Sequence, residues 1–411
     1  MKKKLEIVGE FKKAYPVLEK IWEAGFEAYY VGGSVRDRLL GLKVNDVDIA
    51  TSALPTEIKG IFKRTVDVGI EHGTVLVLAE GSEYEITTFR TESTYKDFRR
   101  PDAVHFVRSL KEDLERRDFT MNAIAMDEIG NLKDPYGGLL DIKEGIIRAV
   151  GNPDERFNED ALRMMRAVRF AAQLDFEIEA STLEAIKNHA ELLEKIAVER
   201  IQVEFEKLLS AAWRQKGLKA MLSTNLYRYC PKLASEKKAL EAMIADEKRF
   251  TDIESAWAML LYLIDRDFKD DSFKDRNFLV KWKLSNKKIQ EARTLYSALK
   301  KRIERQDLDR LDIFYLGKEQ ALKVENLMEH LDKEGKHDEV IELYHDLSIK
   351  NVKELAVTGN DLMQMSSAKA GPWLGQALDQ ALEGVVYKDF PNEKEEIIKH
   401  LKMMNSIPDL I

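Results

Sequence analysis

The pattern of hydrophobic and polar positions divides the chain near residue 150. Before that point, short runs rich in Val, Ile, Thr and Tyr, typical of strands, alternate with helical stretches. Beyond Pro153 the apolar residues recur with the 3.6-residue period of long helices, and Gly and Pro are few. We therefore expect a mixed α/β part followed by an all-helical remainder. The elements predicted in the first part include a strand at 27–31, a short helix at 34–40, and strands at 44–50, 75–79 and 84–89.

Breaks in the helical part suggest further divisions. They fall near 223–225, 265–275 and 358–360, and we place the boundaries of four segments at 1–150, 151–220, 221–330 and 331–411. A chain of 411 residues suggests two to four domains, and 44% hydrophobic content is enough to build their cores. The single cysteine excludes a disulfide framework and a zinc site built on cysteines. With neither a signal-peptide pattern nor an apolar run long enough for a membrane span, we expect a cytoplasmic protein.

A phosphate cradle is predicted at residues 32–37, which read Gly-Gly-Ser-Val-Arg-Asp. Two glycines after a strand allow a sharp turn, and the free amides of the following helix start attract phosphate. Arg36 adds a cation that can bind phosphate through two hydrogen bonds. Taken alone, a Gly-Gly pair is ordinarily only a tight turn.

A pair of carboxylates follows nine residues later. On a strand at 44–50, the two-residue period would put Asp46 and Asp48 on one face. Mg²⁺ takes one or two such carboxylates together with phosphate oxygens, so the pair is our predicted magnesium site. Glu85, on the strand predicted at 84–89, is the candidate for a third ligand. A cradle beside paired carboxylates indicates phosphoryl transfer.

These motifs resemble the signature of the DNA polymerase β-like nucleotidyltransferase superfamily. Three further segments occur in the order seen in class II tRNA nucleotidyltransferases, so the chain resembles a bacterial CCA-adding enzyme. They are residues 116–122 (RRDFTMN), 134–138 (DPYGG) and 159–163 (EDALR). The resemblance implies an α+β fold in which 1–150 is a catalytic head with a small mixed sheet, followed by a helical neck, body and tail.

The resemblance also implies roles for individual residues. Glu85 would support activation of the 3′ hydroxyl of the RNA. The nucleotide would be held by Gly33, Arg36 and Arg117, and in the neck by Asp160, Arg163, Arg166 and Arg169. An alternative for Arg117 is a simple ion pair with Asp113 or Glu115. The polar stretch at 91–102 corresponds to the loop that distinguishes full CCA addition from CC addition.

Asp160 and Arg163 suit the reading of a base. Carboxylate oxygens only accept hydrogen bonds and guanidinium groups only donate them, so the base must offer an amino group beside a ring acceptor. Cytosine and adenine do so, whereas uracil and guanine would each leave two mismatched contacts of about 1–3 kcal/mol. We therefore expect the protein to select CTP and ATP without a nucleic-acid template. By spacing, Asp160, Arg163, Arg166 and Arg169 would lie near one face of a helix, though a surface ion pair with two further arginines is the alternative.

The partner implied by the resemblance is tRNA, gripped at its acceptor and T arms by a possible homodimer. The net charge of −8 is unusual for an RNA-binding protein, but residues 281–310 hold ten Lys or Arg against four acids. This run is either a surface for the RNA backbone or an ordinary solvated helix face. The motifs leave open a poly(A) polymerase, a CC-adding enzyme and a non-catalytic RNA-binding protein.

Overall fold

The computed structural model describes residues 4–69, 72–79, 81–92, 104–266 and 273–408. The chain forms two compact units, Met1–Arg249 with Lys281–Lys283, and Phe250–Val280 with Leu284–Ile411. The boundary between the units falls inside the segment 221–330, and the finer division into four parts remains a prediction. The fold class is confirmed as α+β, with a small mixed sheet in the first unit and helices in the rest of the chain.

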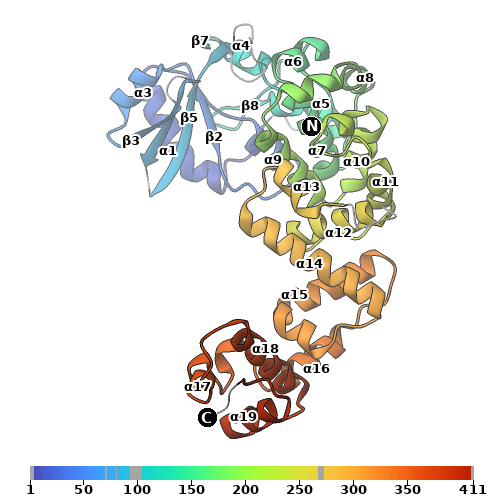
Figure 1. The fold of residues 1–411 in the computed structure, drawn as a ribbon. Helices are drawn as coiled ribbons and strands as arrows, with labels where there is room; N and C mark the ends of the chain where they lie inside the picture. The colour runs from blue at the N-terminus through green and yellow to red at the C-terminus, as the bar shows by residue number, and fades with distance from the viewer. Residues whose placement is uncertain (1–3, 70–71, 80, 93–103, 267–272, 409–411) are drawn as a thin grey trace. The chain divides into compact units, whose positions relative to one another are not determined.

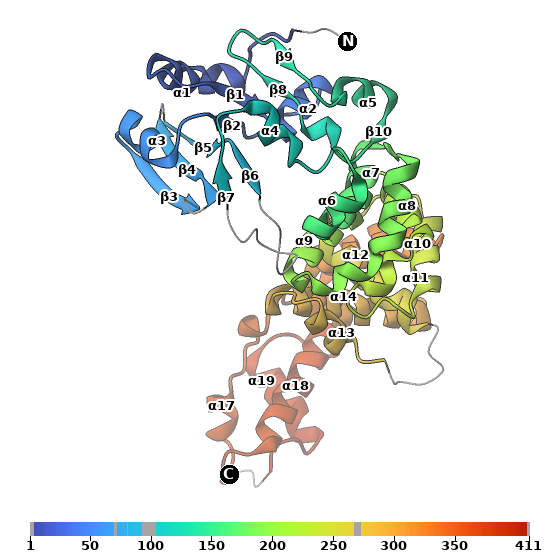
Figure 2. The ribbon, with the colours of Figure 1, turned by 90° about the horizontal axis from the view of Figure 1, so that it is seen from above.

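A seven-stranded sheet forms the head of the first unit (Figures 1 and 2). Its order is β3-β4-β5-β2-β1-β8-β9, with β3 at one edge and β9 at the other. Its strands are β1 (Ala28–Val31), β2 (Asp48–Thr51), β3 (Thr65–Gly69), β4 (Thr74–Ala79), β5 (Ser82–Thr88), β8 (Ala125–Met126) and β9 (Leu132–Lys133). The strands expected at 27–31, 75–79 and 84–89 are thus confirmed to within two residues.

The strand expected at 44–50 was placed too early, because β2 begins only at Asp48. The register explains the difference: Val31, the last residue of β1, pairs with Asp48, and β1 ends there because the chain turns at Gly32. Residues before Asp48 have no ladder partner on that side, so Asp46 lies in irregular chain ahead of the strand. On its other side β2 runs parallel to β5, with Ile49 opposite Ile86.

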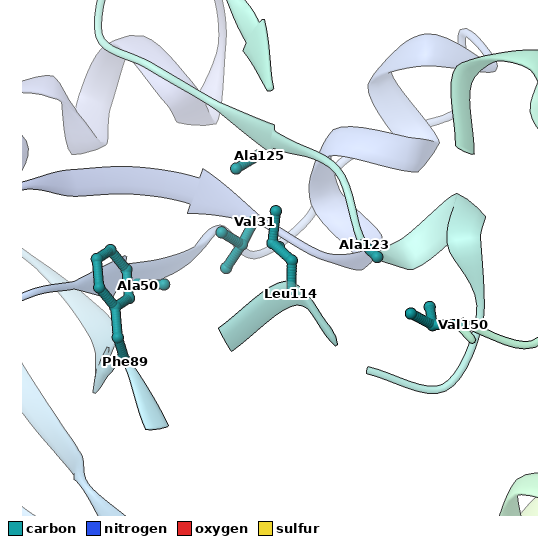
Figure 3. Close-up of a cluster of buried hydrophobic side chains, with 7 residues drawn as sticks. All are labelled: Val31, Ala50, Phe89, Leu114, Ala123, Ala125 and Val150. Carbon is teal, nitrogen blue, oxygen red and sulfur yellow. The ribbon is translucent and has the colours of Figure 1, made fainter. Parts of the chain in front are cut away.

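The two faces of the sheet are covered differently. One face packs on α1 (Glu10–Glu23) and α3 (Pro55–Ile61). The other face is covered in part by α4 (Leu110–Glu115), through a cluster of buried side chains (Figure 3). These side chains are Val31, Ala50, Phe89, Leu114, Ala123, Ala125 and Val150. Because Val31 pairs with Asp48, the same face carries the Asp48 carboxylate beyond the edge of this cluster.

The remaining elements of the first unit are mainly helical. The helices are α2 (Gly33–Leu39), α5 (Gly138–Glu144), α6 (Pro153–Glu159), α7 (Leu162–Leu174), α8 (Ala180–His189), α9 (Val198–Leu209), α10 (Arg214–Ser223) and α11 (Lys237–Ala245). Two small sheets pair β6 (Arg90–Glu92) with β7 (Val104–Phe106), and β10 (Ile146–Ile147) with β11 (Glu177–Ile178). The short strand β11 is an exception to the all-helical remainder that we expected after residue 150. It pairs in parallel with β10, which precedes that boundary.

The named elements of the second unit, over its described residues, are all helices. Its helices are α12 (Ile253–Asp265), α13 (Asp275–Lys281), α14 (Asn286–Arg305), α15 (Arg310–His330), α16 (His337–Asp346), α17 (Gly359–Met363), α18 (Pro372–Tyr387) and α19 (Lys394–Met403). In α15, Gly317 has φ 70° and ψ 165°, so the helix is interrupted there. None of the described helices combines the length and the apolar composition needed to cross a membrane.

The basic run at 281–310 carries less free charge than its composition suggests. Six of its cations pair with acids that lie outside the run. The pairs are Arg293–Asp275, Lys300–Asp265, Lys301–Asp312, Arg302–Glu325, Arg305–Asp312 and Arg310–Asp346. The pair of Arg302 and Glu325 is buried. Much of the local excess of positive charge is therefore compensated within the fold.

Candidate functional site

Three carboxylates gather where β2 and β5 lie side by side. Extending the parallel register by one residue places Glu85 beside Asp48, and both side chains are exposed. Desolvation of the Asp48 carboxyl group by the protein around it raises its pKa. The positive charge of Arg117 lowers this pKa, and the charges of Glu85 and Asp46 raise it further. The carboxylates of Asp46 and Glu85 thus both lie close enough to Asp48 to act on its charge, although Asp46 reaches the site from irregular chain rather than from the strand.

A cation would relieve this repulsion, and the donor set suits Mg²⁺. Hard carboxylate oxygens, open to solvent and beside a turn that can hold phosphate, are the ligands that Mg²⁺ prefers. Across the parts of the chain that the structure describes, no three His, Cys, Asp or Glu side chains converge as a ready cage for an ion. Such an arrangement agrees with the usual Mg²⁺ site of one or two carboxylates completed by phosphate oxygens and water.

The turn after β1 depends on Gly32 more than on Gly33. Gly32 has φ +74°, and a Cβ there would lie 2.9 Å from Nη1 of Arg117 and 3.8 Å from Oδ2 of Asp48. At Gly33, a Cβ would meet only Nη2 of Arg36, at an ordinary 3.6 Å. The guanidinium of Arg117 therefore rests against the bare backbone of Gly32, next to the carboxylates.

Arg117 is held by a buried acid. Oδ2 of Asp113 lies 3.2 Å from Nη2 of Arg117, and Oδ1 of the same carboxylate lies 2.8 Å from Nη2 of Arg116. The alternative of an ion pair with Asp113 is therefore observed. Arg117 nevertheless still lies near the carboxylates, because its charge lowers the pKa of Asp48.

A chain of buried polar groups leads from the cradle to α7. Nη1 of Arg36 donates to Oδ1 of Asn122 (2.6 Å), and Nδ2 of Asn122 donates to Oδ1 of Asp118 (2.9 Å). The second oxygen of Asp118 accepts from Nε of Arg166 (2.7 Å). Burial by itself would raise the pKa of Asp118, but Arg166 and the hydrogen bond from Asn122 lower it to about 2. Asp118 is therefore ionised at neutral pH and links Asn122 to Arg166 of α7.

Three arginines share the ring of Phe170 on α7. The guanidinium carbons of Arg169, Arg36 and Arg166 lie 3.7, 4.8 and 5.5 Å from its centroid, within the range of cation–π attraction. Arg169 also pairs with the buried carboxylate of Glu204 on α9. The like charges can approach because Asp118, Glu204 and the aromatic face offset their repulsion.

Asp160 does not lie on the neck helix, so the expected stripe of four residues on one helix is wrong at its first member. Asp160 has extended backbone (φ −139°, ψ 100°) in the break between α6 and α7. Its Oδ1 accepts from the backbone N–H of Leu162 (3.1 Å), and its Oδ2 accepts from Nη2 of Arg200 (2.7 Å). An Asp whose carboxylate accepts from an N–H at the start of a helix commonly has non-helical backbone, as Asp160 does here. The helical chain is therefore interrupted between α6 and α7.

Arg163 is anchored from two sides. Its Nη1 donates to Oε2 of Glu159 (2.9 Å), and its Nη2 donates to the backbone carbonyl of Arg116 (2.7 Å). A carboxylate offers about four acceptor positions and a guanidinium five donors, so Asp160 and Arg163 both retain capacity for a ligand. The contact between Arg163 and Arg116 joins the neck to the segment that carries Arg117.

The predicted residues therefore occupy one continuous region of the first unit. Asp46, Asp48, Glu85 and Arg117 surround the turn after β1, and Arg36 connects this turn to the arginines of α7. Sequence reasoning did not single out four residues that hold the region together: Asp118, Asn122, Arg200 and Glu204. It included Gly32 in the predicted turn but proposed only Gly33 as a nucleotide-binding residue. Asp118 and Asn122 stood inside the quoted segment 116–122, but only their burial reveals their role. Most of the loop at 91–102 lies outside the described residues.

Known protein families match three segments of this chain. Residues 28–148 match the family described as "Poly A polymerase head domain". Residues 175–237 match the one described as "Probable RNA and SrmB- binding site of polymerase A", and residues 248–401 match "tRNA nucleotidyltransferase domain 2 putative". The CCA-adding enzyme of Enterococcus faecalis is 49% identical over 401 residues, which cover 97% of this chain and 98% of that protein.

Two further relatives agree. The CCA-adding enzyme of Streptococcus thermophilus is 46% identical over 97% of this chain and 98% of that protein. The crystal structure of the Bacillus stearothermophilus CCA-adding enzyme in complex with CTP superimposes with a TM-score of 0.89 at 41% identity, covering 97% of this chain and 98% of that one. The chain belongs to the family of CCA-adding enzymes, the tRNA nucleotidyltransferases.

Proposed function

We propose that this protein adds C, C and A in turn to the 3′ end of tRNA, using CTP and ATP and releasing pyrophosphate at each step. The single observation that carries the proposal is the joining of two features in one unit, the carboxylate group at β2 and β5 and the acceptor–donor pair Asp160 and Arg163. In each step the 3′ oxygen of the RNA bonds to the α-phosphorus, the bond to the bridging oxygen breaks, and the hydroxyl proton is released.

Asp46 and Asp48 would hold Mg²⁺, whose role is to activate the attacking hydroxyl and neutralise the leaving pyrophosphate. Desolvation is the main cause of the raised pKa of Asp48, and the charges of Glu85 and Asp46 add to it; a bound cation would relieve that added repulsion, which supports this assignment. Glu85, which lies beside Asp48, would accept a hydrogen bond from the 3′ hydroxyl. The backbone at Gly32 and Gly33 and the guanidiniums of Arg36 and Arg117 would bind the phosphates.

The base would be read by Asp160 and Arg163. Arg200 and the N–H of Leu162 fix both oxygens of Asp160 while leaving lone pairs for an amino group. Glu159 and the carbonyl of Arg116 fix Arg163 in the same way, leaving donors for a ring nitrogen. Prior fixing of the two side chains reduces the entropy lost on binding and so sharpens selection of cytosine and adenine.

Arg166 and Arg169 are proposed to act on the nucleotide mainly through charge. Both are engaged with acids, Arg166 with Asp118 and Arg169 with Glu204, so their positions are set before a ligand arrives. The guanidinium N–H groups that these acids leave unused would donate to the phosphates of the nucleotide.

The test is incorporation into a tRNA that lacks its CCA end, with Mg²⁺ and with each nucleotide alone and together. We expect extension by two nucleotides with CTP and by three with CTP plus ATP, resolved at single-nucleotide resolution. A stop at two with both nucleotides present would identify a CC-adding enzyme. Binding of tRNA without any extension would identify a non-catalytic RNA-binding protein.

A poly(A) polymerase is the second candidate, because the head matches the family named for that activity. It would produce an open-ended ladder of A residues in the same assay. The full-length relatives named CCA-adding enzymes favour the first candidate.

Three further parts of the proposal concern the setting of the enzyme. We place it in the cytoplasm, as a possible homodimer that contacts the acceptor and T arms of tRNA through its neck, body and tail segments. Light scattering of the purified protein, alone and with tRNA, tests the oligomeric state.

A further inference from the structure

The order of the sheet separates the two sides of the reaction centre. The carboxylates lie on β2 and β5, in the middle of the order β3-β4-β5-β2-β1-β8-β9. The groups proposed to bind the nucleotide lie on the β1 side of them, because Gly32 and Gly33 follow β1 and Arg36 lies on α2. Nothing in the proposed nucleotide site uses the other side, where β4 and β3 extend to the edge of the sheet (Figure 2).

An exposed apolar surface lies on that unused side, on the same face as the carboxylates. Leu76 of β4 pairs directly with Glu85, and Val66 of β3 pairs with Leu76, so the three side chains point the same way. Leu78 lies two residues along from Leu76, on this face. Leu76 and Leu78 are half-buried, and Val66 is 47% exposed. We name Val66, Leu76 and Leu78 the β3–β4 surface.

A cation stands at the edge of this surface. The backbone N–H of Leu78 donates to the carbonyl of Arg64 (3.0 Å), which places Arg64 opposite Leu78 and on the same face. Arg64 is exposed, and no acidic partner for it occurs within the portion of the chain that the structure describes. An apolar surface that ends in a free guanidinium suits the sugar and base of a nucleotide followed by its phosphate.

Displacement at the α-phosphorus fixes which reactant lies here. The attacking and leaving oxygens are in line on opposite sides of phosphorus. If the pyrophosphate leaves toward Gly33 and Arg36, the attacking hydroxyl approaches from the β5 side, and the rest of its nucleoside extends over β4 and β3. Adjacent strands are about 4.8 Å apart, so Leu76 and Val66 lie about 5 and 10 Å from the strand that carries Glu85.

We infer that the β3–β4 surface with Arg64 is the subsite for the 3′-terminal nucleotides of the acceptor RNA strand. The inference rests on the proposed function and adds the residues that hold the growing end. Apolar contact does not depend on hydrogen-bonding groups of the base, so such a subsite accepts the discriminator nucleotide and each added C alike. Arg64 would contact a phosphate of the same strand.

The test uses the full-length chain and a tRNA lacking its CCA end, with KM for the RNA, KM for CTP and kcat measured for each protein. Arg64→Ala is expected to raise KM for the RNA about fivefold and to lower the slope of log KM against log salt by about one. Val66→Asp, which puts a negative charge next to the bound RNA strand, is expected to raise KM for the RNA about tenfold. KM for CTP should stay unchanged in both variants.

Lys12→Ala is the matched control, since it removes an exposed positive charge from α1, which covers the opposite face of the sheet. It should change neither KM. The inference is overturned if Arg64→Ala and Val66→Asp leave KM for the RNA within twofold of the unaltered protein, or if KM for CTP rises in parallel. Failure of the unaltered protein to extend tRNA would instead refute the proposed function, so the two failures are distinguishable.

Discussion

The buried carboxylate of Asp118 allows a quantitative prediction about stability and pH. In the folded protein its pKa is about 2, against an ordinary value of 3.8, because Arg166 and Asn122 outweigh the effect of burial. A group whose pKa is depressed by folding stabilises the protein above its unfolded pKa, and this stabilisation is lost as the pH falls through the folded pKa. The difference corresponds to about 2.5 kcal/mol at neutral pH.

Asp118→Asn keeps the shape of the side chain and removes its charge. We expect the variant to be less stable than the original protein by about 2.5 kcal/mol at pH 7 and nearly the same at pH 5. The difference should shrink to about 1.3 kcal/mol at pH 3, because protonation then weakens the original carboxylate as well. Urea titrations of both proteins, followed by circular dichroism at each pH, measure this difference.

A surface ion pair provides the control. Asp67 bonds Lys59 at 2.9 Å, but both side chains are about half exposed. Asp67→Asn should therefore cost less than about 1 kcal/mol at every pH. The reasoning fails if Asp118→Asn costs no more than this control at pH 7, or if its deficit grows as the pH is lowered.

Three predictions concern the reaction itself. Asp48→Ala should lower incorporation at least about a thousandfold, because Mg²⁺ would lose a ligand and the 3′ hydroxyl would no longer be activated. Binding of tRNA, measured in a filter assay, should be retained, and Asp46→Ala should behave alike. Retained turnover would contradict the metal assignment. Asp160→Ala or Arg163→Ala should reduce the preference for CTP over UTP about tenfold or more in kcat/KM, since each contributes a polar contact of about 1–3 kcal/mol; an unchanged preference would count against base reading. Gly32→Ala should raise KM for CTP about tenfold, because the backbone is left-handed and the new methyl would meet a guanidinium nitrogen at 2.9 Å, whereas Gly33→Ala should be tolerated.

Much of the active region could be predicted from local sequence. The glycine pair after an apolar strand, the Asp-x-Asp motif and Glu85 in a β-branched run each indicate a conformation through short-range rules. The strands and the turn that carry these residues lie within a few residues of their predicted positions. The family resemblance added the roles of Asp160 and Arg163, which spacing alone left open.

Errors arose where a partner far along the chain decides the conformation. The length of β2 depends on where β1 ends, and β1 ends at Gly32, so Asp46 could not be excluded from the strand by its own neighbours. Asp160 carries no mark that separates it from the helix beginning at Leu162. Its contact with Arg200, forty residues away, belongs to the packing of α9 against the neck.

The sequence by itself determined the class of fold, and it predicted the phosphate cradle, the acidic residues and the candidates for base reading, because these depend on residue types at short spacing. Only the tertiary structure decided that Gly32 rather than Gly33 has the left-handed backbone at the turn, and that Asp118 joins Asn122 to Arg166 of α7. It also decided which cations of residues 281–310 are neutralised. Burial, close approach and ion pairing depend on which distant segments come into contact, and hydrophobic periodicity specifies that a face is buried without specifying its partner.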